Sequence, residues 1–371
     1  MIERTDLRMS MYEPETGCYI GAGLWDDVRV NGDMAGFDDA AGKTHGISAC
    51  RMDMGGEFPA SRILQAIAAK KLVLLTVDPP PGANPYDEAM LTQTVKDIGR
   101  YNIPVFVDFF PYSKNMGYGA ESYRRFYRKA WLALREYAPS AAMVWTSNVW
   151  DAADAADYYP GDSYTDWVGL HITADISKTG EYNDFMTAFE EFYALFQDKK
   201  PIMLASLSLS HFSTIDNTYR TGLCGDTLSA FYERVAYHLP RVKAIVYQSY
   251  DNVLEPGRGS KARNNYLITG DDALIRAYRE AVADKRFLSG VSETDGDGFS
   301  VKSPENAAIQ DGILYITADS AETRLNNKRI PGQARDVLGQ KCYPAEAISA
   351  GGADNGSFDV DNENMVVRWR Q

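Results

Sequence analysis

Short apolar or β-branched runs alternate with amphipathic stretches through most of the chain. The runs typical of β-strands cover residues 18–24, 44–54, 72–78, 103–110, 141–148, 166–173, 201–209 and 242–250. Between most of them apolar side chains recur at helical spacing, as Phe126, Ala130 and Leu134 do. Strands separated by helices predict a parallel sheet, and eight such strands predict an α/β fold, a (β/α)8 TIM barrel, over residues 1–289.

The pattern changes after Leu288. The segment SETDGDG (292–298) is a polar, glycine-rich linker, and short β patterns such as GILYITAD (312–319) and NMVVRWRQ (364–371) follow it. Asn and Gly turns separate these runs, and helical periodicity is weak. They predict a small β-rich accessory domain over residues 290–371, which is an ordinary size for a module.

Composition and charge narrow the classes of protein. Hydrophobic residues make up 45% and charged residues 24% of the chain, which indicates a packed core and excludes a disordered protein. A formal net charge of -13 repels phosphate backbones, so we expect no nucleic-acid partner. No apolar run reaches transmembrane length and the first residues lack signal-peptide features, so we expect no membrane insertion. We expect the protein to be cytoplasmic or part of a particle if the chain is used as it is made, and extracellular if a leader was removed.

The sequence predicts no cofactor. The cysteines are far apart and form no CxxC pair, which disfavours a zinc site and a disulfide scaffold and favours isolated buried thiols. They are Cys18, Cys50, Cys224 and Cys342. The Asp/Gly clusters at 295–298 and 359–364 lack the full calcium-loop pattern and are more typical of turns. A structural calcium ion in the C-terminal domain is the alternative.

Polar and aromatic side chains gather where the predicted strands end, which is where barrel enzymes carry their active sites. Aromatic rings stack on sugar CH faces, and amides and carboxylates bind sugar hydroxyls, so this rim predicts a carbohydrate groove. The predicted substrate-binding residues are Trp25, Asp53, Trp145, Asn148, Trp150, Asp151, His171, Tyr247 and Tyr250. The alternative for Trp145 and Tyr247 is that they fill the barrel.

One long segment carries a family resemblance. YYPGDSYTDWVGLHIT (158–173) resembles the region before and within a middle strand of glycoside hydrolase family 26, the β-mannanase family. Four further segments agree in the same order: GFDDAAGKTHGISACRMDMGGEFP (36–59), MVWTSNVWD (143–151), KPIMLASLSLS (200–210) and VKAIVYQSYDN (242–252). The resemblance covers about residues 17–289 and does not extend into the C-terminal domain.

The resemblance implies hydrolysis of β-linked polysaccharides, mostly mannans, by two glutamates. Retention of configuration needs one carboxyl group as nucleophile and one as acid/base. In this sequence Tyr112 stands at the family's acid/base position and Ser206 at its nucleophile position. The comparison therefore indicates a divergent barrel that keeps the frame and has lost both catalytic glutamates.

Three alternatives for catalysis stay open from the residues alone. Asp108 could be a relocated catalytic carboxylate with a second one across the groove, the candidates being Asp78, Asp251 and Glu255. Its simpler interpretation is a salt bridge with Arg51 or Lys114. Ser206 could form a Ser-His-Asp set with His171 and either Asp175 or Asp151, and Tyr112 could act as a nucleophile.

These observations predict a catalytically inactive, family-26-like protein that serves as a carbohydrate-binding or structural module, with an oligo- or polysaccharide as its partner. The first alternative is an active β-glycan hydrolase with relocated carboxylates such as Asp108. The second is a structural or adhesion subunit of a phage or cell-surface assembly, formed through the C-terminal domain.

Overall fold

The structure is a computed structural model, and it describes most of the chain. The described residues are 2–4, 10–14, 16–25, 27–81, 84, 86–101, 103–114, 119–252, 264–290, 301–303, 307–310, 313–325, 330, 332–337, 340–349, 357–361 and 366–370. The predicted catalytic candidate Glu255 and the Asp/Gly cluster at 295–298 lie outside them.

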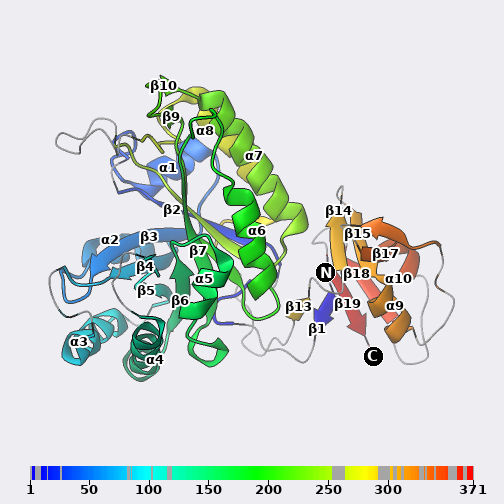
Figure 1. The fold of residues 1–371 in the computed structure, drawn as a ribbon, viewed down its shortest axis with the longest axis horizontal. Coiled ribbons are helices and arrows are strands. Elements are labelled where there is room, and N and C mark those ends of the chain that lie inside the picture. Colours follow the sequence, from blue (N-terminus) through cyan, green and yellow to red (C-terminus); the bar gives the residue numbers. More distant parts are fainter. Residues whose placement is uncertain are drawn as a thin grey trace.

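Eight parallel strands form a closed barrel, as the sequence predicts (Figure 1). They are β2 (Cys18–Gly23), β3 (Ile47–Asp53), β4 (Leu72–Asp78), β5 (Val105–Phe109), β6 (Ala141–Ser147), β7 (Trp167–Ala174), β8 (Ile202–Leu209) and β11 (Val242–Gln248). Each pairs with the next along the chain, and β11 closes the barrel by pairing with β2 from Ala244↔Tyr19 onward. The short strand β12 (Phe287–Leu288) lies beside the start of β2.

Helices cover the outside of the barrel. They are α1 (Met34–Ala41), α2 (Ala60–Ala68), α3 (Glu88–Gly99), α4 (Ala120–Tyr137), α5 (Ala152–Tyr158), α6 (Phe185–Phe196), α7 (Thr221–His238) and α8 (Asp272–Val282). Aspartates begin several of them, because an Asp side chain accepts hydrogen bonds from otherwise unpaired N–H groups of the first turn; Asp33, Asp87 and Asp271 do so. Inward-facing helix residues and outward-facing strand residues together form the main apolar core.

The base of the barrel, at the amino ends of the strands, is closed by the segment 10–14. Met11 and Tyr12 pack on the apolar interior of the barrel, and Trp167 Nε1 donates to the Met11 carbonyl. The Arg241 guanidinium forms a buried ion pair with Glu13 of the same segment. These contacts fix the early part of the chain to the first residues of the later strands.

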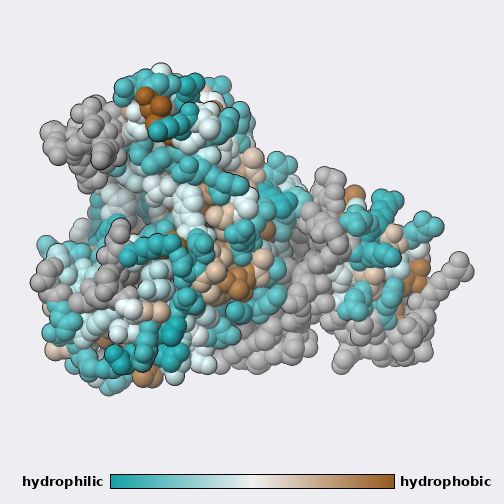
Figure 2. Space-filling view, viewed as in Figure 1, coloured by the Kyte–Doolittle hydropathy of each residue, from teal (hydrophilic) through white to brown (hydrophobic). Residues whose placement is uncertain are grey.

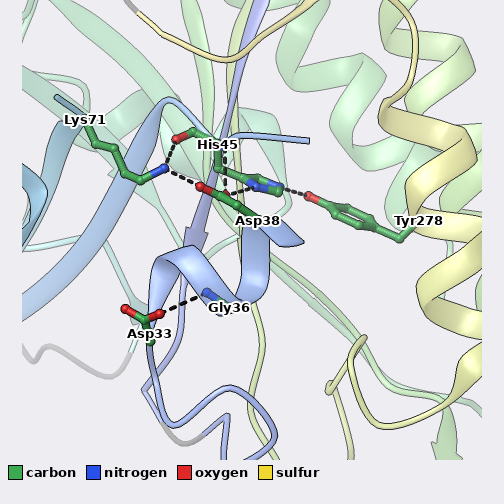
Figure 3. Close-up of polar contacts among 6 residues, drawn as sticks. All are labelled: Asp33, Gly36, Asp38, His45, Lys71 and Tyr278. Carbon is green, nitrogen blue, oxygen red and sulfur yellow. Dashed lines mark hydrogen bonds and ion pairs between the residues drawn. The ribbon is translucent and has the colours of Figure 1, made fainter. Parts of the chain in front are cut away.

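A second polar network at the base surrounds His45 (Figure 3). The His45 ring contacts Asp38 of α1 through Nδ1 and the Tyr278 hydroxyl of α8 through Nε2, each at 2.8 Å. Lys71 Nζ reaches both Asp38 and the His45 carbonyl. The network therefore joins two helices to the starts of β3 and β4.

The second module contains two four-stranded sheets, in the orders β13-β1-β19-β18 and β14-β15-β17-β16. The strands are β1 (Ile2–Arg4), β13 (Val301–Ser303), β14 (Ala307–Gln310), β15 (Ile313–Thr317), β16 (Arg335–Val337), β17 (Gln340–Pro344), β18 (Ser357–Asp361) and β19 (Val366–Arg370), with helices α9 (Ala318–Arg324) and α10 (Ala345–Ser349). Strand β1 pairs with β13 and β19, so both ends of the chain contribute to the module (Figure 1). The sequence patterns did not predict this position of β1. Tyr237 of α7 packs against its apolar core.

All four cysteines are buried free thiols, as their spacing predicts. Among the described residues, no helix combines the length and apolar character that a membrane crossing requires. The face drawn in Figure 2 is mostly hydrophilic, with a small hydrophobic patch at the hairpin of β9 (Phe212–Ser213) and β10 (Thr218–Tyr219), where Ile215 is 53% exposed.

Candidate functional site

A cavity of about 440 Å³ opens at the carboxyl ends of the barrel strands. Its lining combines two aromatic rings, three side-chain amides, three hydroxyls, an arginine and a histidine. These are Trp25, Tyr250, Asn148, Gln248, Asn252, Thr76, Thr173, Ser206, Arg51 and His171. The volume lies in the range of small-ligand sites, and the position is the one that barrel enzymes use.

Strand alternation places these side chains. Successive residues of a strand point to opposite sides, so the inward-facing set of β7 contains Trp167, His171 and Thr173. Deep in the barrel this set is apolar and buried, as at Trp167. Toward the carboxyl end it becomes polar and reaches the cavity, so the floor of the site rests on a packed apolar interior.

Strand β8 has a bulge at the site. Along β7, Leu170 pairs with Leu204 but the next residue, His171, pairs with Ser206, so Ala205 is skipped. The register against β11 shifts at the same place. Bulges re-aim side chains and occur often beside active sites. Ser206 is accordingly the only residue of β8 that is not fully buried.

Asp108 and His171 form the central polar contact. The carboxylate of Asp108 is 0% exposed; its Oδ2 lies 2.8 Å from His171 Nε2, and its Oδ1 accepts a 2.7 Å hydrogen bond from the Thr146 hydroxyl. Trp150 Nε1 donates to the His171 carbonyl at 3.2 Å. Asp108 therefore fixes one nitrogen of the imidazole at the cavity wall, while Trp150 binds the backbone of His171.

A second charged pair lies at the rim. Arg51 donates to both carboxylate oxygens of Asp78, from Nε at 2.6 Å and from Nη2 at 2.9 Å. Burial alone would lower the pKa of Arg51, but the hydrogen bond and charge of Asp78 raise it overall. Across the mouth Trp25 Nε1 donates to Gln248 Oε1, which fixes the indole ring at the edge of the cavity.

The structure brings some of the predicted substrate-binding residues together. Trp25, Asn148, His171 and Tyr250 line the cavity, as does Ser206. Trp150 is not part of the lining but donates to the His171 carbonyl. Four lining residues were not predicted from the sequence: Thr76, Thr173, Gln248 and Asn252. Arg51 was expected only as a partner of Asp108. The two-residue alternation from His171 and Tyr250 would have indicated Thr173 and Gln248.

Other predicted residues lie elsewhere. Trp145 and Tyr247 point away from the cavity, toward the helices: Trp145 packs on Phe196 of α6, and Tyr247 packs on Tyr278 of α8. They do not fill the barrel interior either. Asp151 caps α5, where it accepts from the Asp154 N–H, and Asp53 is exposed outside the cavity lining.

The predicted partners of Asp108 need correction. Arg51 pairs with Asp78 rather than with Asp108, and Lys114 pairs with Asp154. Asp108 faces inward from β5 at the level where His171 faces inward from β7, so these two meet across β6. The candidates Asp175 and Asp151 are engaged elsewhere, Asp175 with the Tyr266 hydroxyl at 2.7 Å.

Tyr112, which was expected from the sequence resemblance to stand at the acid/base position, is not part of the cavity lining. Its ring is buried and stacks on Tyr158 with centroids 3.7 Å apart. Burial, together with the Tyr158 hydroxyl, raises the pKa of Tyr112 to about 12. The phenol therefore stays protonated at neutral pH, which disfavours its use as a nucleophile.

Fold and site together define a (β/α)8-barrel protein with its cavity at the carboxyl ends of the strands. The model of glycosyl hydrolase family 26 matches residues 108–213, a segment that contains Tyr112, His171 and Ser206. The resemblance to this family is thus confirmed over the middle of the barrel. No curated protein matches the chain by sequence.

Solved structures agree on the fold. A modular endo-β-1,4-mannanase of family 26 from Cellulomonas fimi superposes with a TM-score of 0.54 at 13% identity, covering 80% of this chain and 81% of that one. A family 26 β-mannanase from Bacteroides ovatus gives 0.52 at 11% identity, covering 76% and 93%. A family 26 protein from Muricauda sp. gives 0.55 at 10% identity, covering 76% and 89%. At these identities the likeness concerns the fold alone.

Proposed function

We propose that the protein binds a β-linked glycan at the barrel mouth without hydrolysing its glycosidic bonds. The observation that carries this proposal is the lining of the cavity: among the described residues it contains aromatic rings, amides and hydroxyls but no carboxylate. Rings and amides suit the CH faces and hydroxyls of a sugar. Mannan is the first candidate, because the resemblance is to the β-mannanase family.

Hydrolysis by a carboxylate pair meets a geometric obstacle. The acid/base group must reach the glycosidic oxygen, with a second carboxyl group about 5–10 Å away. Asp108 is fully buried, and both of its oxygens are occupied by Thr146 and His171. Asp78 is held on both oxygens by Arg51. These bonds favour binding over glycoside hydrolysis.

Calorimetry with manno-, cello- and xylo-oligosaccharides tests the binding. We expect one class to bind and Trp25→Ala to weaken that binding about 10-fold or more, since the ring supplies stacking area. Tyr101→Ala is the matched control, because this partly buried ring stacks on Phe58 and is not part of the cavity lining. Binding by none of these sugars, or equal losses in both variants, would contradict the proposal.

The alternative of relocated glycoside hydrolysis is tested on the same sugars. Reducing ends would be measured with the unchanged protein and with Asp108→Asn. We expect no release above background. Release that depends on Asp108 would replace the binding proposal with a hydrolytic one.

The second module is proposed as a docking or second glycan-binding unit. This proposal is supported by its separate apolar core, which includes Ile316, Phe358 and Val367. Native mass spectrometry of the full chain tests it: an assembly larger than a monomer favours docking, whereas a monomer with two glycan sites favours the binding unit.

A further inference from the structure

We propose that Ser206, His171 and Asp108 form an acyl-transfer site that cleaves O-acyl esters on the sugar bound at the barrel mouth. The ester chemistry is independent of the glycan proposal; only the identity of the alcohol, a sugar hydroxyl, rests on it. The three residues come from β8, β7 and β5.

His171, the proposed general base of this site, is held in a fixed orientation. A histidine acts as a general base for a serine when a third group fixes its ring and stabilises the imidazolium. Here the buried Asp108 carboxylate holds His171 Nε2 at 2.8 Å, and the Thr146 hydroxyl holds the carboxylate. The remaining ring nitrogen, Nδ1, is the one that would accept a proton.

The nucleophile lies beside the base. Ser206 and His171 are register partners on neighbouring parallel strands, and both line the cavity. Side chains of paired residues project to the same side of a sheet. The bulge at Ala205 produces this pairing; with a regular register Ala205 would be the partner of His171.

Both reacting atoms are open. Among the described residues, neither the Ser206 hydroxyl nor His171 Nδ1 has a hydrogen-bond partner, and neither is a fully buried atom left unpaired. By contrast, the next serine of the strand, Ser208, is buried and donates to the Gln248 carbonyl at 3.4 Å. Contacts of catalytic residues without substrate are often longer than hydrogen bonds and tighten when substrate binds.

The reaction balances without a cofactor. Ser206 Oγ attacks the ester carbonyl carbon while His171 Nδ1 takes the hydroxyl proton. The tetrahedral intermediate collapses, the bond between the acyl carbon and the sugar oxygen breaks, and the imidazolium returns the proton to that oxygen. Water then attacks the acyl-serine with His171 as base, which releases the carboxylic acid and restores Ser206. The side-chain amide of Asn148 lines the same cavity and is of the type that stabilises an oxyanion.

Covalent labelling is the first test. The full-length protein is treated with a fluorophosphonate and, separately, with p-nitrophenyl acetate, and the adduct is mapped by peptide mass spectrometry. We expect a single adduct on Ser206. Turnover of p-nitrophenyl acetate should fall about 10²–10⁴-fold in Ser206→Ala and in His171→Gln.

Matched variants separate chemistry from folding. Ser61→Ala removes an exposed hydroxyl from α2 and should leave labelling and turnover unchanged. Asp108→Asn acts through His171, so it should lower kcat with little change in KM. Turnover in Ser206→Ala equal to that of the unchanged protein, or an adduct elsewhere, overturns the proposal.

Glycan binding is measured independently of ester turnover. Calorimetry is repeated on Ser206→Ala, with acetylated and deacetylated manno-oligosaccharides. Ser206-dependent ester turnover without binding of either sugar would overturn the glycan proposal alone. Sugar binding without Ser206-dependent turnover of p-nitrophenyl acetate or acetylated sugar would overturn the acyl-transfer site alone.

Discussion

The barrel holds a histidine–aspartate pair at each end, with the same 2.8 Å contact in both. At the base, His45 is fully buried and its two ring nitrogens contact Asp38 and Tyr278. At the mouth, His171 is bound to Asp108 through one nitrogen, and the other faces no described partner. One pair is therefore saturated and structural, whereas the other can still accept a proton. The free nitrogen, rather than the pair itself, distinguishes a candidate site.

The arginine pairs repeat this contrast. Arg241 and Glu13 at the base are 7% and 6% exposed, whereas Arg51 and Asp78 at the mouth are 53% and 25% exposed. An ion pair without access to water is costly to break from one side, but an exposed pair contributes little to stability. The ion pair at the base is thus expected to contribute more to the stability of the fold than the pair at the mouth.

The largest expected effect is at the buried arginine. Arg241→Ala leaves the Glu13 carboxylate buried without its partner, so we expect a loss of about 3–5 kcal/mol in the free energy of unfolding. Arg51→Ala, its counterpart at the mouth, should cost less than about 1 kcal/mol. Urea unfolding followed by circular dichroism measures both. Equal losses would show that the two ends do not differ in this way.

The next largest difference in stability is expected between variants of the two histidines, His45 and His171. His45→Gln cannot keep both Asp38 and Tyr278 bonded, so we expect a loss of about 2–3 kcal/mol from buried groups left unpaired. His171→Gln should cost less than about 1 kcal/mol, because its amide can still donate to Asp108 and water reaches the cavity. The two unfolding curves, measured in parallel, check this; a larger loss at His171 would contradict it.

Sequence patterns predicted the barrel well because most strands are rich in apolar or β-branched residues and are separated by helical patterns, as around β4. They did not predict the direction of individual side chains. Trp145 and Tyr247 were expected in the groove, yet each stands one position from an inward-facing residue, and a shift of one residue reverses the side of the sheet. Such a shift is invisible in an apolar run.

The sequence predicted several residues of the site but not which of them contact one another. Ser206 and His171 were named from the sequence, but the bulge that aligns them depends on the register of neighbouring strands. The partner of His171 was sought among nearby residues such as Asp175, whereas the structure supplies Asp108, 63 residues earlier in the chain. Closure of the barrel brings such distant positions together, and no local pattern encodes that distance.

A smaller effect is expected in the pH dependence of stability, which tests whether His45 at the base is buried and neutral. Burial lowers the pKa of His45, and its hydrogen bond to Asp38 offsets this only in part. The unfolded chain therefore takes up a proton at His45 more readily, so stability is complete above the ordinary histidine pKa of about 6.5 and falls as the pH drops below it. We expect the free energy of unfolding to fall between pH 7 and pH 5.5, as measured by urea unfolding at each pH.

The control for this titration is His45→Gln, which should lower the slope of stability against pH. His211, whose pKa burial lowers to about 4, remains in both proteins and contributes equally. The difference between the two slopes therefore isolates His45. Parallel slopes would contradict a neutral, saturated histidine at the base.

The smallest effect is expected at Tyr112, which was predicted from the sequence resemblance to stand at the acid/base position. Tyr112→Phe keeps the ring that stacks on Tyr158 and removes only a buried hydroxyl, so we expect a stability loss of about 1 kcal/mol or less. Because Tyr112 does not line the cavity, sugar affinity and ester turnover should stay unchanged. Calorimetry and the p-nitrophenyl acetate assay check this. A loss of turnover with stability intact would place Tyr112 in the chemistry and move the site away from His171.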